Sequence, residues 1–218
     1  MKKQFGVIGL GRFGTTVAIN LERLGYPVLA IDRDRDLIDS IKESVSFADI
    51  VDATDPESLE ACGIKNCDTV IVAIGDVESS ILVSLLLEEF GIKNIIAKAG
   101  SAIHGRVLRK IGVKEVIFPE EDMGIRVANK ITSANILDYI AISPEVDLLD
   151  YKATKKLADK SLRELALRNR FGINIIAIKR DEDVIVSPSA DEVIKENDEL
   201  FIIGRTPDLF DFKKEFEG

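Results

Sequence analysis

Three glycines near the start of the chain have the spacing of a phosphate-binding loop. Gly9, Gly11 and Gly14 spell G-x-G-x-x-G. In such a loop the first glycine permits a tight turn, the second lets a phosphate approach the backbone, and the third lets a helix pack close to a sheet. The helix that follows offers free N–H groups and its positive dipole end to an anion. We therefore expect Gly11, Arg12 and Phe13 to present backbone N–H groups to a di- or triphosphate.

The flanking sequence supplies the elements that such a loop requires. The apolar run Phe5–Gly9 predicts a buried strand, Thr15–Leu24 a helix, and Pro27–Asp32 the next strand. A lone G-x-G-x-x-G is a weak signal, but strand, loop, helix, strand and a terminal acid together predict a Rossmann nucleotide site. The Asp32 carboxylate is then expected to hydrogen-bond a ribose hydroxyl and to repel a 2′-phosphate, which argues against NADP.

Residues at the ends of the other predicted strands should complete this site, because open α/β sheets bind ligands at that edge. Arg33 either flanks the adenine or is a solvated charge, and the solvated charge is favoured. Lys98 either contacts a ligand phosphate or is a solvated neighbour, and the contact is favoured. The remaining candidates are Asp52, Ala53 and Thr54 at the adenine edge, and Ala73, Ile74 and Gly75 along the phosphate and sugar crevice.

Six apolar runs of strand length alternate with five helix-like stretches in the first two-thirds of the chain. The runs are Phe5–Gly9, Pro27–Asp32, Ser46–Val51, Thr69–Ile74, Asn94–Ala97 and Glu115–Phe118. The helices expected between them are Thr15–Leu24, Asp34–Lys42, Pro56–Cys62, Val77–Glu89 and Ala102–Lys110. This order predicts an α/β fold with a Rossmann-like, doubly wound parallel sheet.

The pattern changes after Pro119. Glu120–Tyr139 is amphipathic and predicts one long helix, which either packs on the sheet or crosses over to dock on another subunit. From Ser143 onward the pattern of strands and short helices predicts a smaller α+β domain. We therefore expect an N-terminal nucleotide-binding domain at 1–133, including the start of the crossover helix, a helical linker at 134–142 and a C-terminal domain at 143–218.

Composition narrows the function classes. The 218 residues carry a formal net charge of −9, which argues against a nucleic-acid partner and against adsorption to an anionic membrane. No apolar run reaches the ~18–20 residues of a membrane span, so no direct membrane insertion is expected. Cys62 and Cys67 fit reduced thiols in a cytosolic protein. His104, the single histidine, is expected on a helix surface.

Several segments resemble one known family. In the N-terminal part they are Gly9–Gly14, Ile50–Asp55, Val72–Gly75 and Phe118–Gly124; in the C-terminal part they are Ala153–Leu157, Phe171–Ile178 and Ser187-Pro188. Over its whole length the chain resembles the cytosolic regulatory subunits of Trk/Ktr-type potassium uptake systems, the TrkA/KtrA family. These proteins have an N-terminal regulator-of-potassium-conductance (RCK) domain and a smaller C-terminal one.

The resemblance implies roles for individual residues. Arg12 would reach the terminal phosphate of a nucleotide held by the neighbouring subunit, which would favour ATP over ADP. Glu120 would contribute to a site for a divalent cation near the nucleotide phosphates. The C-terminal domain would bind cyclic di-AMP between two of its copies through Arg168, Ile175, Ile176 and Pro188.

The resemblance also implies a regulator without enzymatic activity. Its partner would be a separate membrane potassium-translocating subunit, and its homo-oligomer would range from a dimer to an octameric ring. It would be cytoplasmic and held at the inner face of the cell membrane through that partner. ATP, ADP, NAD and NADH all suit the glycine loop. The alternatives are an NAD-dependent oxidoreductase, disfavoured because the second domain contains no histidine, and a nucleotide-binding adaptor of another membrane transporter.

Overall fold

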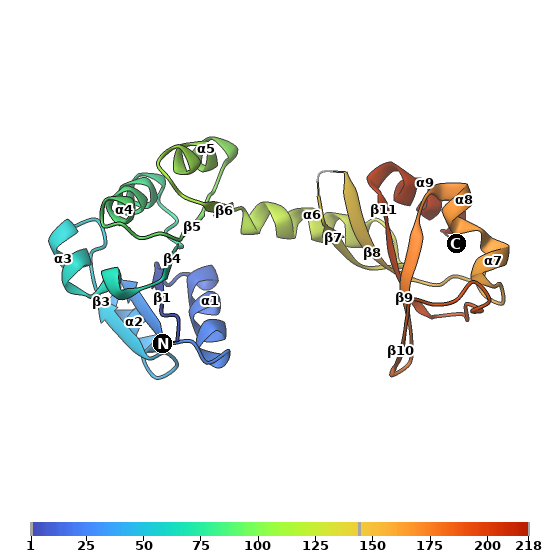
Figure 1. The fold of residues 1–218 in the computed structure, drawn as a ribbon, viewed down its shortest axis with the longest axis horizontal. Helices are drawn as coiled ribbons and strands as arrows, with labels where there is room; N and C mark the ends of the chain where they lie inside the picture. The colour runs from blue at the N-terminus through green and yellow to red at the C-terminus, as the bar shows by residue number, and fades with distance from the viewer. Residues whose placement is uncertain (1, 144, 218) are drawn as a thin grey trace. The chain divides into compact units, whose positions relative to one another are not determined.

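The computed structural model describes residues 2–143 and 145–217 and divides the chain into two compact units (Figure 1). The first unit is Met1–Glu121 and the second is Asp122–Gly218. Each unit has a sheet and a hydrophobic core of its own. None of the helices in the described ranges combines the length and apolar character that a membrane span requires.

The first unit is a six-stranded sheet in which every adjacent pair is parallel, in the order β3-β2-β1-β4-β5-β6. The strands are β1 (Phe5–Ile8), β2 (Val28–Asp32), β3 (Phe47–Ile50), β4 (Thr69–Val72), β5 (Ile95–Lys98) and β6 (Glu115–Ile117). The connecting helices are α1 (Arg12–Arg23), α2 (Arg35–Ile41), α3 (Pro56–Ala61), the 3₁₀ helix η1 (Ile64–Asn66), α4 (Val77–Glu89) and α5 (Ala102–Lys110). The predicted doubly wound α/β fold is confirmed.

Two apolar clusters cover the two faces of this sheet. Neighbouring strand residues point to opposite faces, so Val7 belongs to one cluster and Ile8 to the other. This two-sided burial explains why β1, β2 and β4 read as continuous apolar runs in the sequence. The strand order reverses at β1, between β2 and β4, and that reversal opens a crevice at the carboxyl ends of the strands.

The glycine loop joins β1 to α1, and its backbone is closely packed at Gly9 and Gly14. Gly9 has φ +93°, a left-handed conformation that glycine adopts most easily. A Cβ added to Gly14 would lie 1.9 Å from the carbonyl oxygen of Gly9, whereas one added to Gly11 would meet no described atom within 4 Å. The backbone therefore requires glycine at Gly9 and Gly14 for turn and packing, and it leaves open space in front of Gly11.

The second unit is a five-stranded antiparallel sheet in the order β10-β9-β11-β8-β7. Its strands are β7 (Ile136–Ala141), β8 (Val146–Lys152), β9 (Asn174–Arg180), β10 (Asp183–Val186) and β11 (Glu199–Arg205). Its helices are α6 (Pro119–Ile131), which begins in the first unit, α7 (Leu162–Leu165), α8 (Leu167–Phe171) and α9 (Thr206–Phe216). Helices α7, α8 and α9 cover one face of this sheet (Figure 1). The rings of Tyr151 and Phe212 meet there edge to face, with their centroids 5.3 Å apart.

The expected helical linker at 134–142 is wrong. Helix α6 ends at Ile131, and residues 136–141 form β7, which pairs with β8. Ile136 is buried in the core of the second unit, so strand pairing and burial outweigh the helical periodicity that the apolar residues suggest. The second unit thus begins earlier than the expected position 143, and it includes most of α6.

Candidate functional site

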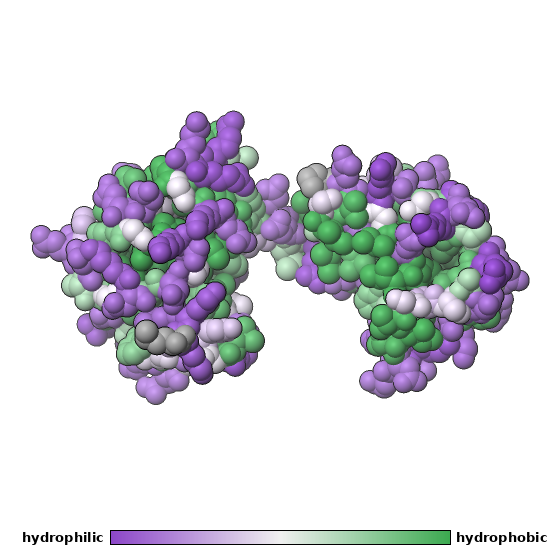
Figure 2. Space-filling model, in the orientation of Figure 1, coloured by the Kyte–Doolittle hydropathy of each residue, from purple (hydrophilic) through white to green (hydrophobic). Residues whose placement is uncertain are grey.

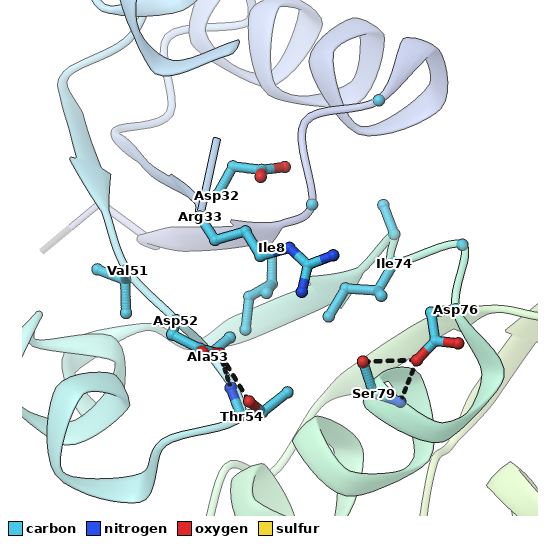
Figure 3. A pocket seen from close by; sticks show the side chains of 14 residues that line it. Ile8, Asp32, Arg33, Val51, Asp52, Ala53, Thr54, Ile74, Asp76 and Ser79 are labelled. Carbon is cyan, nitrogen blue, oxygen red and sulfur yellow. Dashed lines mark hydrogen bonds between the residues drawn. The ribbon is translucent and has the colours of Figure 1, made fainter. Parts of the chain in front are cut away.

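A hollow of about 250 Å³ lies in the crevice at the carboxyl ends of the first four strands (Figure 3). The structure brings most of the predicted nucleotide-binding residues together around it. The predicted residues that line it are Gly9, Gly11, Asp32, Arg33, Asp52, Ala53, Thr54, Ala73, Ile74 and Gly75. Arg12, Phe13, Gly14 and Lys98 are outside this lining.

Asp32 connects the end of β2 to the glycine loop. Its carboxylate accepts hydrogen bonds from the backbone N–H of Leu10 at 2.6 Å and of Asp34 at 2.9 Å. These two donors fix the orientation of the carboxylate at the edge of the hollow. Each carboxylate oxygen has further acceptor capacity, so Asp32 can accept a ribose hydroxyl without releasing the loop.

The opposite wall of the hollow carries a second fixed acid. Asp52 accepts from the backbone N–H of Thr54 at 3.0 Å and from its hydroxyl at 2.6 Å. These hydrogen bonds from Thr54 lower the pKa of Asp52. Arg33 is exposed, and its guanidinium extends across the hollow toward Ile74 in Figure 3.

Sequence reasoning missed part of this lining. Ile8, Val51, Asp76 and Ser79 also face the hollow. Asp76 caps the N-terminus of α4, because it accepts from the backbone N–H of Ser79 at 2.9 Å and from its hydroxyl at 2.6 Å. An Asp directly after Gly75 and before an apolar helix is an N-cap signal that could have identified it.

The start of α1 leaves its first-turn N–H groups without a side-chain cap. Helix α1 begins at Arg12, and its N-cap is Gly11, which has no side chain to offer to the first-turn N–H groups. Arg12 is exposed, Phe13 packs against the core, and Gly14 is buried against Gly9. The uncapped helix N-terminus therefore faces the open space next to Gly11, as phosphate binding requires.

Lys98 and Glu120 lie together in a neighbouring hollow of about 180 Å³, where Lys98 Nζ and Glu120 Oε1 are 2.5 Å apart. The hydrogen bond from Lys98 lowers the pKa of Glu120. Ile74 and Gly75 line both hollows, so the two are adjacent. Lys98 therefore neutralises Glu120 instead of reaching the first hollow.

The donor set for a divalent cation is incomplete. Within the described parts of the chain, no three histidine, cysteine or acidic side chains come together in a way that could hold a metal ion. Glu120 is exposed and already paired with a cation. A divalent cation at this position would need further oxygen ligands, which nucleotide phosphates can supply.

The expected surface position of His104 is wrong. Its exposed fraction is 3%, its Nδ1 accepts from the backbone N–H of Gly100 at 3.3 Å, and burial lowers its pKa. His104 and Leu108 are four residues apart and share the buried face of α5, a spacing that could have placed it correctly. The buried, neutral imidazole stabilises the turn that follows β5.

The four predicted C-terminal ligand residues lie on α8, β9 and the segment after β10. Ile175 packs against the core, whereas Ile176 is 41% exposed, so the two neighbours point apart. The backbone N–H of Ser187 donates to the carbonyl oxygen of Ile176 at 2.9 Å, which brings Pro188 beside it. Arg168 is exposed on α8, and a shared ligand for these residues stays a prediction.

Comparisons with known proteins agree with this architecture. Residues 5–119 match the TrkA-N domain and residues 151–217 match the TrkA-C domain. The chain is 45% identical to the Ktr system potassium uptake protein C of Bacillus subtilis (strain 168) over 215 residues, which are 98% of this chain and 97% of that protein.

Two solved structures share the fold. The GsuK channel bound to NAD aligns with a TM-score of 0.54 at 22% identity, over 98% of this chain and 38% of the channel. GsuK bound to ADP aligns with a TM-score of 0.50 at 24% identity, over 59% of this chain and 33% of that one. At these identities the likeness establishes the fold alone. The two domain matches and the near full-length relative establish more: the chain belongs to the TrkA/KtrA family of RCK-domain subunits of Trk/Ktr-type potassium uptake systems.

Proposed function

We propose that this chain is a nucleotide-sensing regulatory subunit that gates a separate membrane potassium transporter. The observation that carries the proposal is the hollow at the carboxyl ends of β1–β4. It combines an uncapped helix N-terminus, a glycine turn and two fixed acids, Asp32 and Asp52. This is the chemistry of an adenine nucleotide site whose ribose carries free hydroxyls.

The named relatives support the same reading. Ktr system potassium uptake protein C is similar over nearly its whole length, and GsuK structures with the same fold are described as bound to NAD or ADP. ATP and ADP are the proposed physiological ligands, and NAD or NADH is the alternative. Arg12 would distinguish ATP from ADP by reaching the terminal phosphate of a nucleotide in a neighbouring subunit.

Gating requires a partner and an oligomer. Helix α6 has no buried residue among those described, and Met123, Val127 and Ile131 are 52%, 49% and 78% exposed. An isolated helix of this length is marginal in water, so its apolar side chains favour cover by a second copy of the chain. Figure 2 also shows hydrophobic surface over the strands of the second unit. Dimers formed in this way would assemble into a ring of up to eight subunits at the cytoplasmic face of the membrane partner.

Mechanistically, the ring would have two geometries, one stabilised by ATP and the other by ADP. A nucleotide can shift this equilibrium only by its differential affinity for the two geometries. Arg12, exposed at the loop, is positioned to add such a difference because it would contact a phosphate that ADP lacks. A divalent cation held by Glu120 and the phosphates would add to the same effect.

The oxidoreductase alternative has less support. Hydride transfer to a carbonyl substrate needs a positioned acid or base, and the single histidine, His104, lies on the buried face of α5. The chain is therefore proposed to have no enzymatic activity. An adaptor for another membrane transporter remains a second candidate, which normal nucleotide binding without a potassium uptake defect in a deletion strain would favour.

The test is thermal stability of the purified full chain with ATP, ADP, NAD and NADH, each with and without Mg²⁺. We expect ATP and ADP to raise the Tm by different amounts in the wild type and by equal amounts in Arg12→Ala. Arg23→Ala, an exposed arginine in the last turn of α1, is the matched control and should behave as the wild type. Equal responses to ATP and ADP in the wild type and in Arg12→Ala would rule out phosphate sensing by Arg12.

Two companion measurements address the other proposed ligands. If Glu120 holds a divalent cation, Glu120→Gln should abolish the additional Tm increase that Mg²⁺ gives with ATP. If the C-terminal unit binds cyclic di-AMP, calorimetry should detect heat that Arg168→Ala removes. The absence of heat with the wild type would rule out cyclic di-AMP binding without affecting the proposed cation site at Glu120.

A further inference from the structure

The second unit contains a hollow of about 490 Å³ that the nucleotide site does not involve. Lys152 at the end of β8 and Lys155 and Lys156 in the turn after it all line this space. One acid, Glu196, lines the same space. Three lysines against one acid leave an excess of positive charge, although the chain as a whole carries −9.

Two of these lysines are available to a ligand. Glu199 is the register partner of Lys152 across β8 and β11, but it pairs instead with Lys179 at 3.0 Å. Among the residues that the structure describes, neither Lys152 nor Lys155 forms an ion pair. Their ammonium groups therefore lie beside the hollow without a counter-charge from the described chain.

The turn that carries the lysines is held in place on two sides. Lys156 Nζ donates to the carbonyl oxygens of Glu215 and Glu217 at 3.2 and 2.6 Å, at the end of α9. On the other side, the backbone N–H of Asn197 donates to the carbonyl oxygen of Ala153 at 3.2 Å. A backbone fixed in this way reduces the entropy that an incoming ligand would have to remove.

We propose that this hollow binds a phosphate-bearing anion through Lys152 and Lys155. Asn135 and Asn197 line the same space, and their side-chain amides are neutral hydrogen-bond donors. An excess of two positive charges matches a doubly charged phosphate better than a single carboxylate. The phosphate could belong to a free metabolite or to a lipid headgroup, since both present the same oxygens.

The test is acylation of lysine side chains in the full-length protein, followed by peptide mass spectrometry. Inorganic pyrophosphate is the soluble probe, and vesicles of phosphatidylglycerol are the lipid probe. We expect at least one probe to protect Lys152 and Lys155 while leaving Lys93 and Lys110, exposed lysines of the first unit, unprotected. Protection by pyrophosphate assigns a soluble ligand, and protection by vesicles alone assigns a lipid headgroup.

Variants supply the second readout. The double substitution Lys152→Gln/Lys155→Gln should weaken binding of the protecting probe about tenfold, because two charge-assisted contacts are lost. It leaves Lys156 and its bonds to α9 intact, so the fold is expected to persist. The matched control is Lys93→Gln/Lys110→Gln, which removes the same charge elsewhere. Absence of protection by both probes, or equal weakening in both double variants, would overturn the proposal.

Discussion

At the scale of single residues, Gly11 and Gly14 share one loop but differ in the space around them. A methyl group at Gly14 would overlap the carbonyl oxygen of Gly9, so Gly14→Ala must displace α1 or the loop. We expect Gly14→Ala to lower the free energy of unfolding by about 3 kcal/mol or more, and nucleotide binding to be lost with it. Urea denaturation and calorimetry with ATP measure the two effects.

Gly11→Ala is the matched control for this steric argument. Its φ of −63° suits alanine, and no described atom lies within 4 Å of the added Cβ. The free energy of unfolding should therefore fall by no more than about 1–2 kcal/mol, the size of an N-cap effect. Nucleotide affinity should still fall, because the new methyl group occupies the space in front of the first-turn N–H groups. If both variants lost stability equally, crowding at Gly14 would not be the cause.

Asp150 gives a residue-scale prediction about pH. Its Oδ1 is buried and has no hydrogen-bond partner among the described residues, and burial, with repulsion from Glu199 and Asp138, raises its pKa to about 6. The unfolded value is about 3.9, so between these two values the folded state binds more protons and stability falls as pH rises. The free energy of unfolding of Asp150→Asn should therefore exceed that of the wild type by about 1–2 kcal/mol at pH 7.5 and by less at pH 4.5.

Urea unfolding of both proteins at the two pH values measures this difference. The exposed Asp211→Asn serves as the control for the change in net charge alone. A gain in stability for Asp150→Asn that is equal at pH 4.5 and pH 7.5 would mean that the protonation of Asp150 is not responsible.

At the scale of elements, the sequence predicts the first unit better than the second. The strands β1, β2 and β4 are covered on both faces, so each reads as an apolar run. Asp34, Asp55 and Asp76 cap helices α2, α3 and α4. Strand β7 was mistaken for part of a helix because Ile136, Leu137 and Ile140 fall on one face of a helix, whereas the consecutive Ile136 and Leu137 interrupt the alternation typical of a strand. The choice between helix and strand is decided by pairing with β8, a tertiary contact that local propensity does not reveal.

Most of the candidate site was predictable from the positions of its residues at strand ends. Residues that follow a strand end, such as Asp32 and Ala73, are placed at the crevice by topology alone. The ion pair between Lys98 and Glu120 was not predictable, because it depends on the direction that the chain takes after β6, the parallel neighbour of β5. The burial of His104 could have been predicted from its spacing to Leu108, four residues later on α5. A single polar residue on a helix does not by itself indicate which face it occupies.

An ion pair that joins two elements of the second unit supports a prediction at this scale. Asp198, 3% exposed, accepts from Arg180 Nε at 2.9 Å and Nη2 at 2.8 Å, and from the backbone N–H of Lys195 at 2.9 Å. These bonds join the end of β9 to the turn before β11. Asp198→Ala removes these three bonds and leaves Arg180 with Glu192 at 3.4 Å and the carbonyl oxygen of Val193 at 2.9 Å. We therefore expect a loss of about 2–3 kcal/mol in the free energy of unfolding.

The control for this prediction is an ion pair of the same chemistry on the surface. Asp191 and Arg163 are 2.9 Å apart, but both side chains are more than half exposed. Asp191→Ala should cost less than about 1 kcal/mol, because water solvates the freed arginine. Similar losses for the two variants in urea denaturation would indicate that burial does not determine the strength of the Asp198 pair.

At the scale of the whole molecule, two features of the surface have opposite effects on self-association: the net negative charge and the exposed apolar residues of α6. A net charge of −9 makes copies of the chain repel one another, and that repulsion weakens as salt screens it. Helix α6, by contrast, exposes Met123, Ile125, Val127 and Ile131 to solvent. Association through α6 should therefore be driven by apolar contact and should strengthen with ionic strength.

This balance predicts the behaviour of a charge placed on α6. Val127 is 49% exposed, so Val127→Glu should leave the fold of a single copy intact while burying a carboxylate in any interface that covers the helix. We expect a loss of oligomer in sedimentation velocity at concentrations where the wild type associates. Leu24→Glu, which adds the same charge at a residue 72% exposed in the first unit, should sediment as the wild type does. If Leu24→Glu dissociates the oligomer as fully as Val127→Glu, net charge and not the apolar surface of α6 controls assembly.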